Sequence, residues 1–412
     1  MEFRKRTLDN GLTIVAECNE EAHSAALGFF VNTGSRDEHD AISGVSHFLE
    51  HMVFKGTGSR SAEDVNREFD EMGAHYNAFT SEENTVYYAA VLPECQERAV
   101  SLLADLIRPA LRKEDFDTEK QVIIEEIKMY EDQPPFGADE KAKAAFFGPH
   151  PLSRSVLGTA ESITALEVEQ MREYLERRYS PGNITLAAAG RIDFDRLTAD
   201  AERLSRSWKP APAKREEPAF KPVESFLVLP RPSATQEYVL QFAPGPKATD
   251  ADRYAAKLLG VIVGDEQGSR LFWELVDPGH AEQVSLGHHD YQGAGIFSAY
   301  MSCEPEQTAD NLQRMLDVYR KVEAEGVTEP ELERAKSKVN SRVVLSSERP
   351  RSRLFAVGAN WMQRGEYRSV SDDLKAVAKL TVPELNAVLK RYPLSVNTTV
   401  AVGPLTEVGR PK

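Results

Sequence analysis

A chain of 412 residues with 41% hydrophobic residues is long enough for more than one globular core, and we expect two domains. The formal net charge of −15 offers no basic surface for phosphate groups, so nucleic acid is not expected as a partner. No apolar run of about 18 residues indicates a membrane span and no apolar signal core follows the first residues, so we expect a cytoplasmic protein without membrane contact. The three cysteines are odd in number and far apart, which predicts neither a disulfide framework nor a cysteine metal site.

The first half of the chain alternates predicted strands and helices. It opens with a hairpin over residues 7–15, in which Asn10-Gly11 forms the turn. An apolar strand over residues 25–33 follows, and residues 43–56 then carry apolar side chains at helical spacing up to Gly56. Further along, the sequence predicts helices over 62–72, 94–106, 114–130 and 165–179, and strands over 77–80, 84–91 and 183–190.

The helix predicted within residues 43–56 carries the most informative pattern in the chain. His47 and His51 lie one turn apart on a face that they share with Glu50, away from the apolar stripe. The pattern His-x-x-Glu-His inverts the commoner His-Glu-x-x-His arrangement, in which two histidines bind a metal ion and the glutamate serves as general base. An ordinary polar helix face is the other interpretation, and the pattern alone therefore suggests zinc without requiring it.

The second half of the chain repeats the first. Residues 208–225 are rich in Pro, Lys and Glu and are predicted to be a linker between a domain over 1–207 and another over 226–412. The segment EYLERRYSPGNITLAAAG near the end of the first domain corresponds to AVLKRYPLSVNTTVAVG in the second, with a period of about 213 residues. We therefore expect an α+β fold with two homologous domains, each a mixed sheet covered by helices on one face.

The duplication serves as an internal control for the candidate metal site. In this alignment Glu119 lies opposite Ala335 and Glu126 lies opposite Arg342, so the fold itself does not require these glutamates. Residues 264–275, which read GDEQGSRLFWEL, are aligned with the histidine helix and lack its motif. Metal chemistry is therefore expected in the first domain alone.

A catalytic zinc ion needs a third protein ligand and leaves its fourth position to water. Glu119 and Glu126 are seven residues apart, about two helical turns, and therefore lie on the same face of their predicted helix. From the residues alone, either carboxylate can be the third ligand.

The histidine motif followed by Glu126 resembles the inverted zinc signature of the pitrilysin, insulysin and mitochondrial processing peptidase family, here in a short two-domain bacterial form. The resemblance covers essentially the whole chain and rests on the segments TLDNGLTIV, GSRDE, GVSHFLEHMVFKGT, NAFTSEENTVYY and EEIKMYEDQP. It implies a zinc metalloendopeptidase that acts on oligopeptides or unfolded segments. It also implies one Zn²⁺ per chain, bound by His47, His51 and Glu126.

The resemblance assigns roles to the remaining carboxylates. Glu50 would be the general base that activates water, and Glu119 would orient a ligand histidine by hydrogen bonding. Glu125 competes with Glu126 for the place of third ligand. It lies about 100° around the helix from Glu126 and off the face shared with Glu119, so we favour Glu126.

One predicted strand resembles the edge strand onto which the family adds its substrate as an extra strand through main-chain hydrogen bonds. It consists of Asn77, Ala78, Phe79 and Thr80. This would give extended peptides a loose sequence preference, and a purely structural strand is the alternative.

The second domain departs from the family pattern. Active members carry an Arg and a Tyr within stretches like LREK and GLAYSV, whereas residues 274–285 here contain neither. Members of this length form half of a clamshell, so two chains close around the substrate. The resemblance therefore implies a dimer, in the first place a heterodimer with a homologous chain that carries the Arg and the Tyr, and otherwise a homodimer.

Two other functions compete with the peptidase. The family includes scaffold subunits that have lost their zinc ligands, and the intact ligand set of this chain favours the enzyme. A zinc hydrolase of non-peptide substrates rests only on the generality of the metal chemistry.

Overall fold

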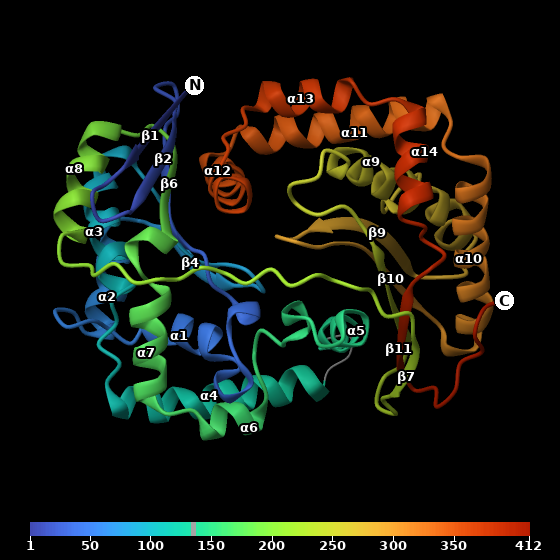
Figure 1. Cartoon of the computed structure of the whole chain (residues 1–412), viewed down its shortest axis with the longest axis horizontal. Coiled ribbons are helices and arrows are strands. Elements are labelled where there is room, and N and C mark those ends of the chain that lie inside the picture. The colour runs from blue at the N-terminus through green and yellow to red at the C-terminus, as the bar shows by residue number, and fades with distance from the viewer. Residues whose placement is uncertain (133–136) are drawn as a thin grey trace. The chain divides into compact units, whose positions relative to one another are not determined.

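The computed structural model describes residues 1–132 and 137–412, which form two compact units (Figure 1). Unit 1 comprises Met1–Lys128, Arg154–Glu216 and Val344–Arg368, and unit 2 comprises Met129–Ser153, Glu217–Val343 and Ser369–Lys412. The last two residues of the EEIKMYEDQP segment lie outside the described residues. Across the described parts of the chain, no helix combines the length and the apolar character that a membrane crossing needs.

Unit 1 is built on a mixed six-stranded sheet. Its strand order is β1-β2-β6-β3-β5-β4, in which β2 and β6 run parallel and the other neighbours run antiparallel. The predicted hairpin is present, with Thr7 opposite Thr13. Strand β4 forms one edge. The strands are β1 (Glu2–Thr7), β2 (Thr13–Cys18), β3 (Ala25–Val31), β4 (His75–Thr80), β5 (Thr85–Val91) and β6 (Ile184–Gly190).

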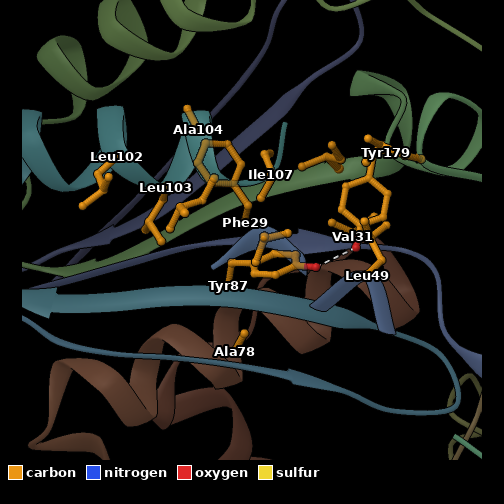
Figure 2. Close-up of a cluster of buried hydrophobic side chains, with 14 of the residues drawn as sticks. Phe29, Val31, Leu49, Ala78, Tyr87, Leu102, Leu103, Ala104, Ile107 and Tyr179 are labelled. Carbon is orange, nitrogen blue, oxygen red and sulfur yellow. Dashed lines mark hydrogen bonds between the residues drawn. The ribbon is translucent and has the colours of Figure 1, made fainter. Parts of the chain in front are cut away.

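Most helices of the first half pack on one face of this sheet and form the larger core. Side chains of β3 such as Phe29 meet Leu103 and Ile107 from the end of α3, as Figure 2 shows. Within this apolar region the hydroxyl groups of Tyr87 and Tyr179 hydrogen-bond to each other at 2.7 Å. The helices are α1 (Val45–Val53), α2 (Ala62–Glu71), α3 (Gln96–Leu106), α4 (Lys113–Asp132), α6 (Ala160–Ala165), α7 (Val168–Arg178) and α8 (Phe194–Ser205).

The opposite face of the same sheet is covered by α12 (Pro350–Arg364), a helix from the second half of the sequence. Leu354 and Val357 of α12 are buried against Phe30 and other strand residues. Gly358 permits this close approach, because a Cβ atom there would lie 2.4 Å from the Phe30 ring. The sheet is therefore covered on both faces, where the sequence predicted one.

Unit 2 repeats the sheet. Its order β7-β11-β8-β10-β9 matches β2-β6-β3-β5-β4 of unit 1, and the starts of β2 and β7 at positions 13 and 226 agree with the predicted period. The α+β class with two homologous mixed sheets is thus confirmed. The strands are β7 (Phe226–Pro230), β8 (Glu237–Pro244), β9 (Gln283–Asp290), β10 (Gly295–Cys303) and β11 (Thr398–Gly403).

One face of the second sheet carries helices of the second half, and the other carries a helix of the first half. This helix, α5 (Ala138–Phe147), buries Phe146 and Phe147 against Phe242 of β8. The two halves of the sequence have therefore exchanged one helix each, which is why the compact units differ from the contiguous ranges 1–207 and 226–412. The other helices are α9 (Arg253–Gly264), α10 (Thr308–Glu325), α11 (Glu329–Ser347), α13 (Val370–Ala378) and α14 (Val382–Arg391).

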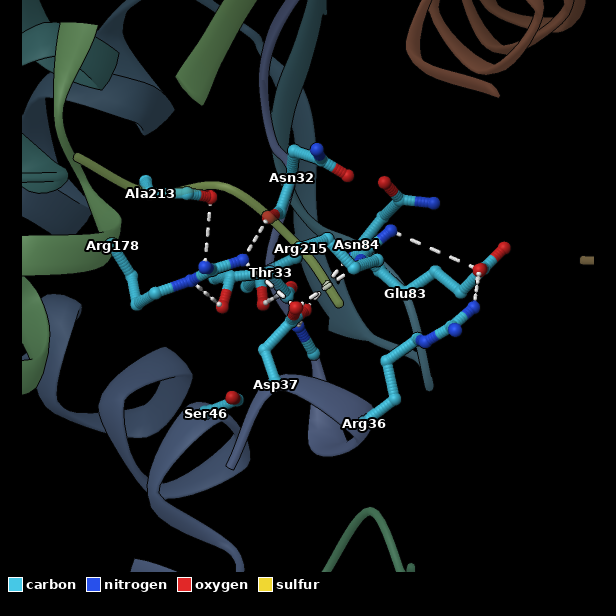
Figure 3. Close-up of polar contacts among 12 residues, drawn as sticks. Asn32, Thr33, Arg36, Asp37, Ser46, Glu83, Asn84, Arg178, Ala213 and Arg215 are labelled. Atoms are coloured by element: carbon cyan, nitrogen blue, oxygen red, sulfur yellow. Dashed lines mark hydrogen bonds and ion pairs between the residues drawn. The ribbon is translucent and has the colours of Figure 1, made fainter. Parts of the chain in front are cut away.

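The segment predicted as a linker has no regular secondary structure, but its side chains are anchored. Arg215 is buried in unit 1, where its guanidinium and that of Arg178 both bind Asp37, at 2.6 and 2.9 Å (Figure 3). Five residues later, Phe220 packs against Phe147 of unit 2. The part of this segment up to residue 216 thus belongs to unit 1 and the part after it to unit 2.

Candidate metal centre

Helix α1 is held at its first turn by a buried carboxyl group from an earlier loop. Glu38 accepts hydrogen bonds from the main-chain N–H groups of Gly44, at 2.7 Å, and Ser46, at 2.8 Å. Gly44 has φ of +88°, and a Cβ atom there would lie 2.4 Å from the carbonyl oxygen of Leu157, so glycine is required. Glu38 satisfies N–H groups that Gly44 has no side chain to cap. The start of the helix is thereby fixed at Val45, two residues before His47.

Three side chains converge beside α1. His47 and His51 lie with their ring centroids 4.7 Å apart, and Glu126 approaches from α4. Its Oε2 atom lies 3.9 Å from Nε2 of His47 and 3.6 Å from Nε2 of His51. The candidate ligand atoms all lie within 4.8 Å of one another. Atoms about 2 Å from a common zinc ion are separated by about 3 to 4 Å, so this cluster is close to the size of a metal site.

The electrostatic environment of the cluster suits a cation. Burial, with His51 nearby, lowers the pKa of His47 to about 3, which keeps its imidazole neutral as a metal ligand must be. Burial also raises the pKa of Glu126, which indicates that its negative charge is incompletely compensated by the protein. Two imidazole nitrogens and one carboxylate oxygen are a donor set used by catalytic zinc sites, so the residues fit the ion that the sequence predicts.

Glu119 orients His51. Its Oε1 atom lies 2.9 Å from Nδ1 of His51, and its Oε2 atom lies 2.5 Å from Nζ of Lys55. Burial acts to raise the pKa of Glu119, but these two bonds hold it below its usual value. An ionised Glu119 accepts a hydrogen bond from the protonated Nδ1 and thereby leaves the lone pair of Nε2 free on the side of Glu126. The structure therefore brings Glu119 into hydrogen-bonding contact with His51, and its predicted role in orienting a metal ligand stays a prediction.

Glu50 lies on the same helix with its carboxylate held by the neighbouring strand. The hydroxyl group of Thr80 donates a 2.6 Å hydrogen bond to Oε2 of Glu50. Burial raises the pKa of Glu50, and this hydrogen bond opposes the increase. A carboxylate with a raised pKa is a better proton acceptor near neutral pH than an exposed one.

The two adjacent glutamates of α4 point in different directions. The side chain of Glu125 is 71% exposed and pairs with Lys128 at 2.7 Å, whereas that of Glu126 is 24% exposed and faces the two histidines. This geometry agrees with the choice of Glu126 over Glu125.

The four predicted substrate-binding residues lie on β4, the edge strand of the first sheet. Asn77 and Phe79 are exposed, whereas the side chain of Ala78 is buried in the core and only its main chain remains available. The N–H group of Ala78 donates to Oδ1 of Asn77 at 2.9 Å. Thr80 alone among the four contacts the candidate centre through its side chain.

The corresponding place in unit 2 is closed by ion pairs. Arg342, the counterpart of Glu126, pairs with Asp265 at 2.7 Å, and Lys338 reaches the same carboxylate at 2.8 Å. Asp265 follows α9, which occupies the position of α1 because it comes directly after β8 as α1 comes after β3. The sequence alignment of residues 264–275 with the histidine helix was therefore wrong by one element. The conclusion that the second half lacks the histidine motif at this position still holds, since α9 carries neither His nor Glu.

Two contacts of the centre were not predicted from the sequence. Glu38 and Lys55 both occur inside segments that supported the family resemblance, but no helical spacing or charge pattern connects them to the histidines. Their roles depend on contacts between distant parts of the chain. The assignment of Thr80 was incomplete for the same reason.

The fold and the site together define a two-domain α+β protein with a candidate metal-ligand cluster in the first of its two homologous units. A family model described as "Insulinase (Peptidase family M16)" matches residues 13–160, and one described as "Peptidase M16 inactive domain" matches residues 165–339. The chain belongs to peptidase family M16.

Similar proteins include named zinc proteases. "Uncharacterized zinc protease Rv2782c" of Mycobacterium tuberculosis is 35% identical over 394 residues, which span 94% of this chain and 90% of that protein. "Uncharacterized zinc protease YmxG" of Bacillus subtilis is 30% identical over 393 residues, or 94% of this chain and 95% of that protein.

Solved structures share the fold. A protease from Helicobacter pylori has a TM-score of 0.90 at 21% identity and covers 97% of this chain and 99% of its own. A peptidase M16 inactive domain from Pseudomonas fluorescens has a TM-score of 0.91 at 21% identity, with complete coverage of both chains. At this level of identity the likeness concerns the fold alone.

Proposed function

We propose that this chain is a zinc-dependent metalloendopeptidase that cleaves oligopeptides or unfolded polypeptide segments. The observation that carries the proposal is the cluster of His47, His51 and Glu126 within 4.8 Å, beside helix α1, which also presents Glu50. When bound there, Zn²⁺ would supply Lewis-acid chemistry and lower the pKa of water toward neutrality. The names of the relatives support the same assignment.

Each residue of the centre has a separate role in hydrolysis. His47, His51 and Glu126 hold the ion, and Glu119 keeps His51 in the tautomer that presents Nε2. Glu50 takes a proton from water as the water oxygen attacks the scissile carbonyl carbon. It then passes this proton to the amine nitrogen as the C–N bond breaks.

The free edge of strand β4 is a reason to propose a peptide as the substrate. Main-chain groups along a free edge pair with any extended peptide, which gives affinity with little sequence preference. Because Thr80 at the end of β4 also holds Glu50, a peptide paired with this strand would pass beside the general base.

Two substitutions distinguish the role of the general base from that of the metal ligands. Glu50→Gln should retain one equivalent of zinc and lose peptide cleavage by about 10² to 10⁴-fold, because only the proton acceptor is removed. His47→Ala should lose both zinc and cleavage. Zinc content is measured by mass spectrometry and cleavage with a quenched peptide library. Cleavage by Glu50→Gln at the native rate would overturn the proposal.

We further propose that the active form is a closed dimeric chamber, in the first place a heterodimer. Val276 and Gln283 lie in the stretch where active relatives of the resembled family carry Arg and Tyr. Each transition-state donor that is missing typically costs about 10² to 10³-fold in rate. A second chain of the same family with those two residues would supply them to the zinc centre of this chain.

The partner is tested by assaying the purified chain alone and mixed with such a homologue from the same source. Activity that rises with the added chain supports the heterodimer. Full activity of the isolated chain, unchanged by the added homologue, would contradict the heterodimer and favour an active homodimer. Retention of zinc without cleavage in either case would favour the scaffold function instead.

A further inference from the structure

Unit 1 contains a cavity that belongs to neither the metal centre nor the edge strand. Its volume is about 790 Å³. It is bounded by the ends of α3 and α7 and by the segment of residues 207–211 that follows α8, and none of the residues of the metal centre lines it. A cavity of this size accommodates a small molecule.

Arg108 is the most unusual residue of this cavity. Its guanidinium stacks on the ring of Trp208 at 4.1 Å and donates hydrogen bonds to the carbonyl oxygens of Ile107, at 2.9 Å, and Tyr179, at 2.8 Å. These carbonyl groups end helices α3 and α7 and carry only partial negative charge. They orient the guanidinium without neutralising it.

Among the residues that the structure describes, no carboxylate forms an ion pair with Arg108. Its charge is nevertheless largely removed from water, and this burial lowers the pKa of Arg108 to about 10. A guanidinium has five N–H donors, and the two carbonyl groups use two of them. The side chain thus retains donors and an uncompensated charge at the wall of a cavity.

The remaining charges of the lining are also mainly positive. Arg172 and Lys209 are exposed residues of the same cavity, and within the described ranges neither has an acidic partner. The cation of Arg60 is already bound to Glu68 and Asp105. Asp105 and Glu176 are the two acidic residues of the lining. In a chain with a net charge of −15, this local excess of positive charge is a feature of the cavity and not of the overall composition.

We propose that this cavity binds a small polyanion, a molecule with at least two phosphate or carboxylate groups. Arg108 would hold one oxyanion, because its planar fork matches the oxygen atoms of such groups. Arg172 and Lys209 would hold the others. The cavity is larger than a single phosphate ion requires, which favours a ligand with several charged groups.

The test is isothermal titration calorimetry on the full chain at low ionic strength. Tripolyphosphate and citrate are the two probes, and orthophosphate is the small reference. The first variant is Arg172→Glu/Lys209→Glu, which changes two exposed residues of the lining. Because Arg172 also donates a hydrogen bond to the carbonyl oxygen of Leu111 at 3.3 Å, thermal unfolding of this variant is measured as well. The matched control is Arg177→Glu/Lys214→Glu, an equal change of charge on α7 and on the same downstream segment, at exposed positions outside the cavity lining.

We expect at least one probe to bind the native chain more tightly than orthophosphate. The first variant should weaken this binding by about tenfold or more, and the control by less than about twofold. Preference for tripolyphosphate would identify a phosphate ligand, and preference for citrate a carboxylate ligand. Arg108→Lys keeps the charge but loses the fork and should also bind more weakly, with thermal unfolding measured because the guanidinium holds two helix ends.

Two results would overturn the proposal. One is the absence of binding of both probes at millimolar concentration. The other is an equal affinity of the two double variants, which would assign the binding to the metal centre or to general charge attraction. Because the measured quantity is binding and not cleavage, the outcome is independent of the proposed peptidase function.

Discussion

Thr80 on the edge strand β4 donates a 2.6 Å hydrogen bond to Glu50 on helix α1. This bond joins the strand on which a peptide would pair to the carboxylate that would accept a proton from water. Two elements that are separated by a complete helix in the sequence therefore share one functional contact.

Replacement of Thr80 by Val tests this contact. The hydroxyl group stabilises the ionised form of Glu50, so its loss should raise the pKa of Glu50 further. Since the base must be ionised, the acidic limb of the pH profile of kcat/KM should move to higher pH, by about one unit for a hydrogen bond to a charged group. Zinc content should not change. An unmoved acidic limb would contradict the role of Thr80.

Glu126 and Glu125 form a matched pair. Glu126→Gln should weaken zinc binding severely because it removes a ligand charge, whereas Glu125→Gln should leave it within about twofold, because Glu125 contacts Lys128 at the surface. Zinc affinity is measured by competition with a chromophoric chelator. The opposite ranking would mean that the ligand is the other glutamate.

Glu119→Gln should lower zinc affinity by about 10 to 100-fold, since partners that orient a ligand histidine typically contribute this much. The glutamine keeps an acceptor for His51 but loses the charge that also binds Lys55. Glu114→Gln, an exposed position at the start of the same helix, is the control. The same chelator competition measures both variants, and equal affinities would show that Glu119 has only a structural role.

Because Glu38 is buried, we expect the free energy of unfolding to depend on its ionisation and therefore on pH. Burial raises its folded-state pKa to about 8, above an ordinary value near 4.5. The folded state therefore binds this proton more tightly than the unfolded state. The contribution of Glu38 is fully present below about pH 4.5 and is lost as the pH rises through 8.

Glu38→Gln cannot ionise and should lack this loss. As the pH rises from 5 to 8, the free energy of unfolding of the native chain should decrease relative to that of the variant. Urea denaturation at several pH values measures the difference between the two proteins. Parallel pH profiles would show that Glu38 is already ionised in the folded protein at low pH.

Local patterns were sufficient to predict most strands and helices of the first half. The apolar periodicity of residues 43–56 predicted α1, and Asn10-Gly11 predicted the turn between β1 and β2, because both depend on neighbours within a few residues. Helical spacing also put Glu125 off the face that Glu119 and Glu126 share, since an angle around a helix is determined by the number of residues.

These local patterns could not predict the exchange of α5 and α12 between the two units. An amphipathic helix shows that it has an apolar face but not which sheet will cover that face. Phe146 and Leu354 are buried on sheets formed mainly by the other half of the chain, and only the packed structure identifies those sheets.

The sequence by itself determined which candidate ligands share a helix face, His47 with His51 and Glu119 with Glu126, because positions within a regular helix follow from residue spacing. The packing of α4 beside α1 then brought Glu126 to the two histidines. The tertiary structure alone decided what holds this cluster: Glu38 at the start of α1, Lys55 beside Glu119, and Thr80 on Glu50. The physical reason is that hydrogen bonds and ion pairs between distant segments depend on where complete elements pack. A local pattern of charge or spacing contains no record of that packing.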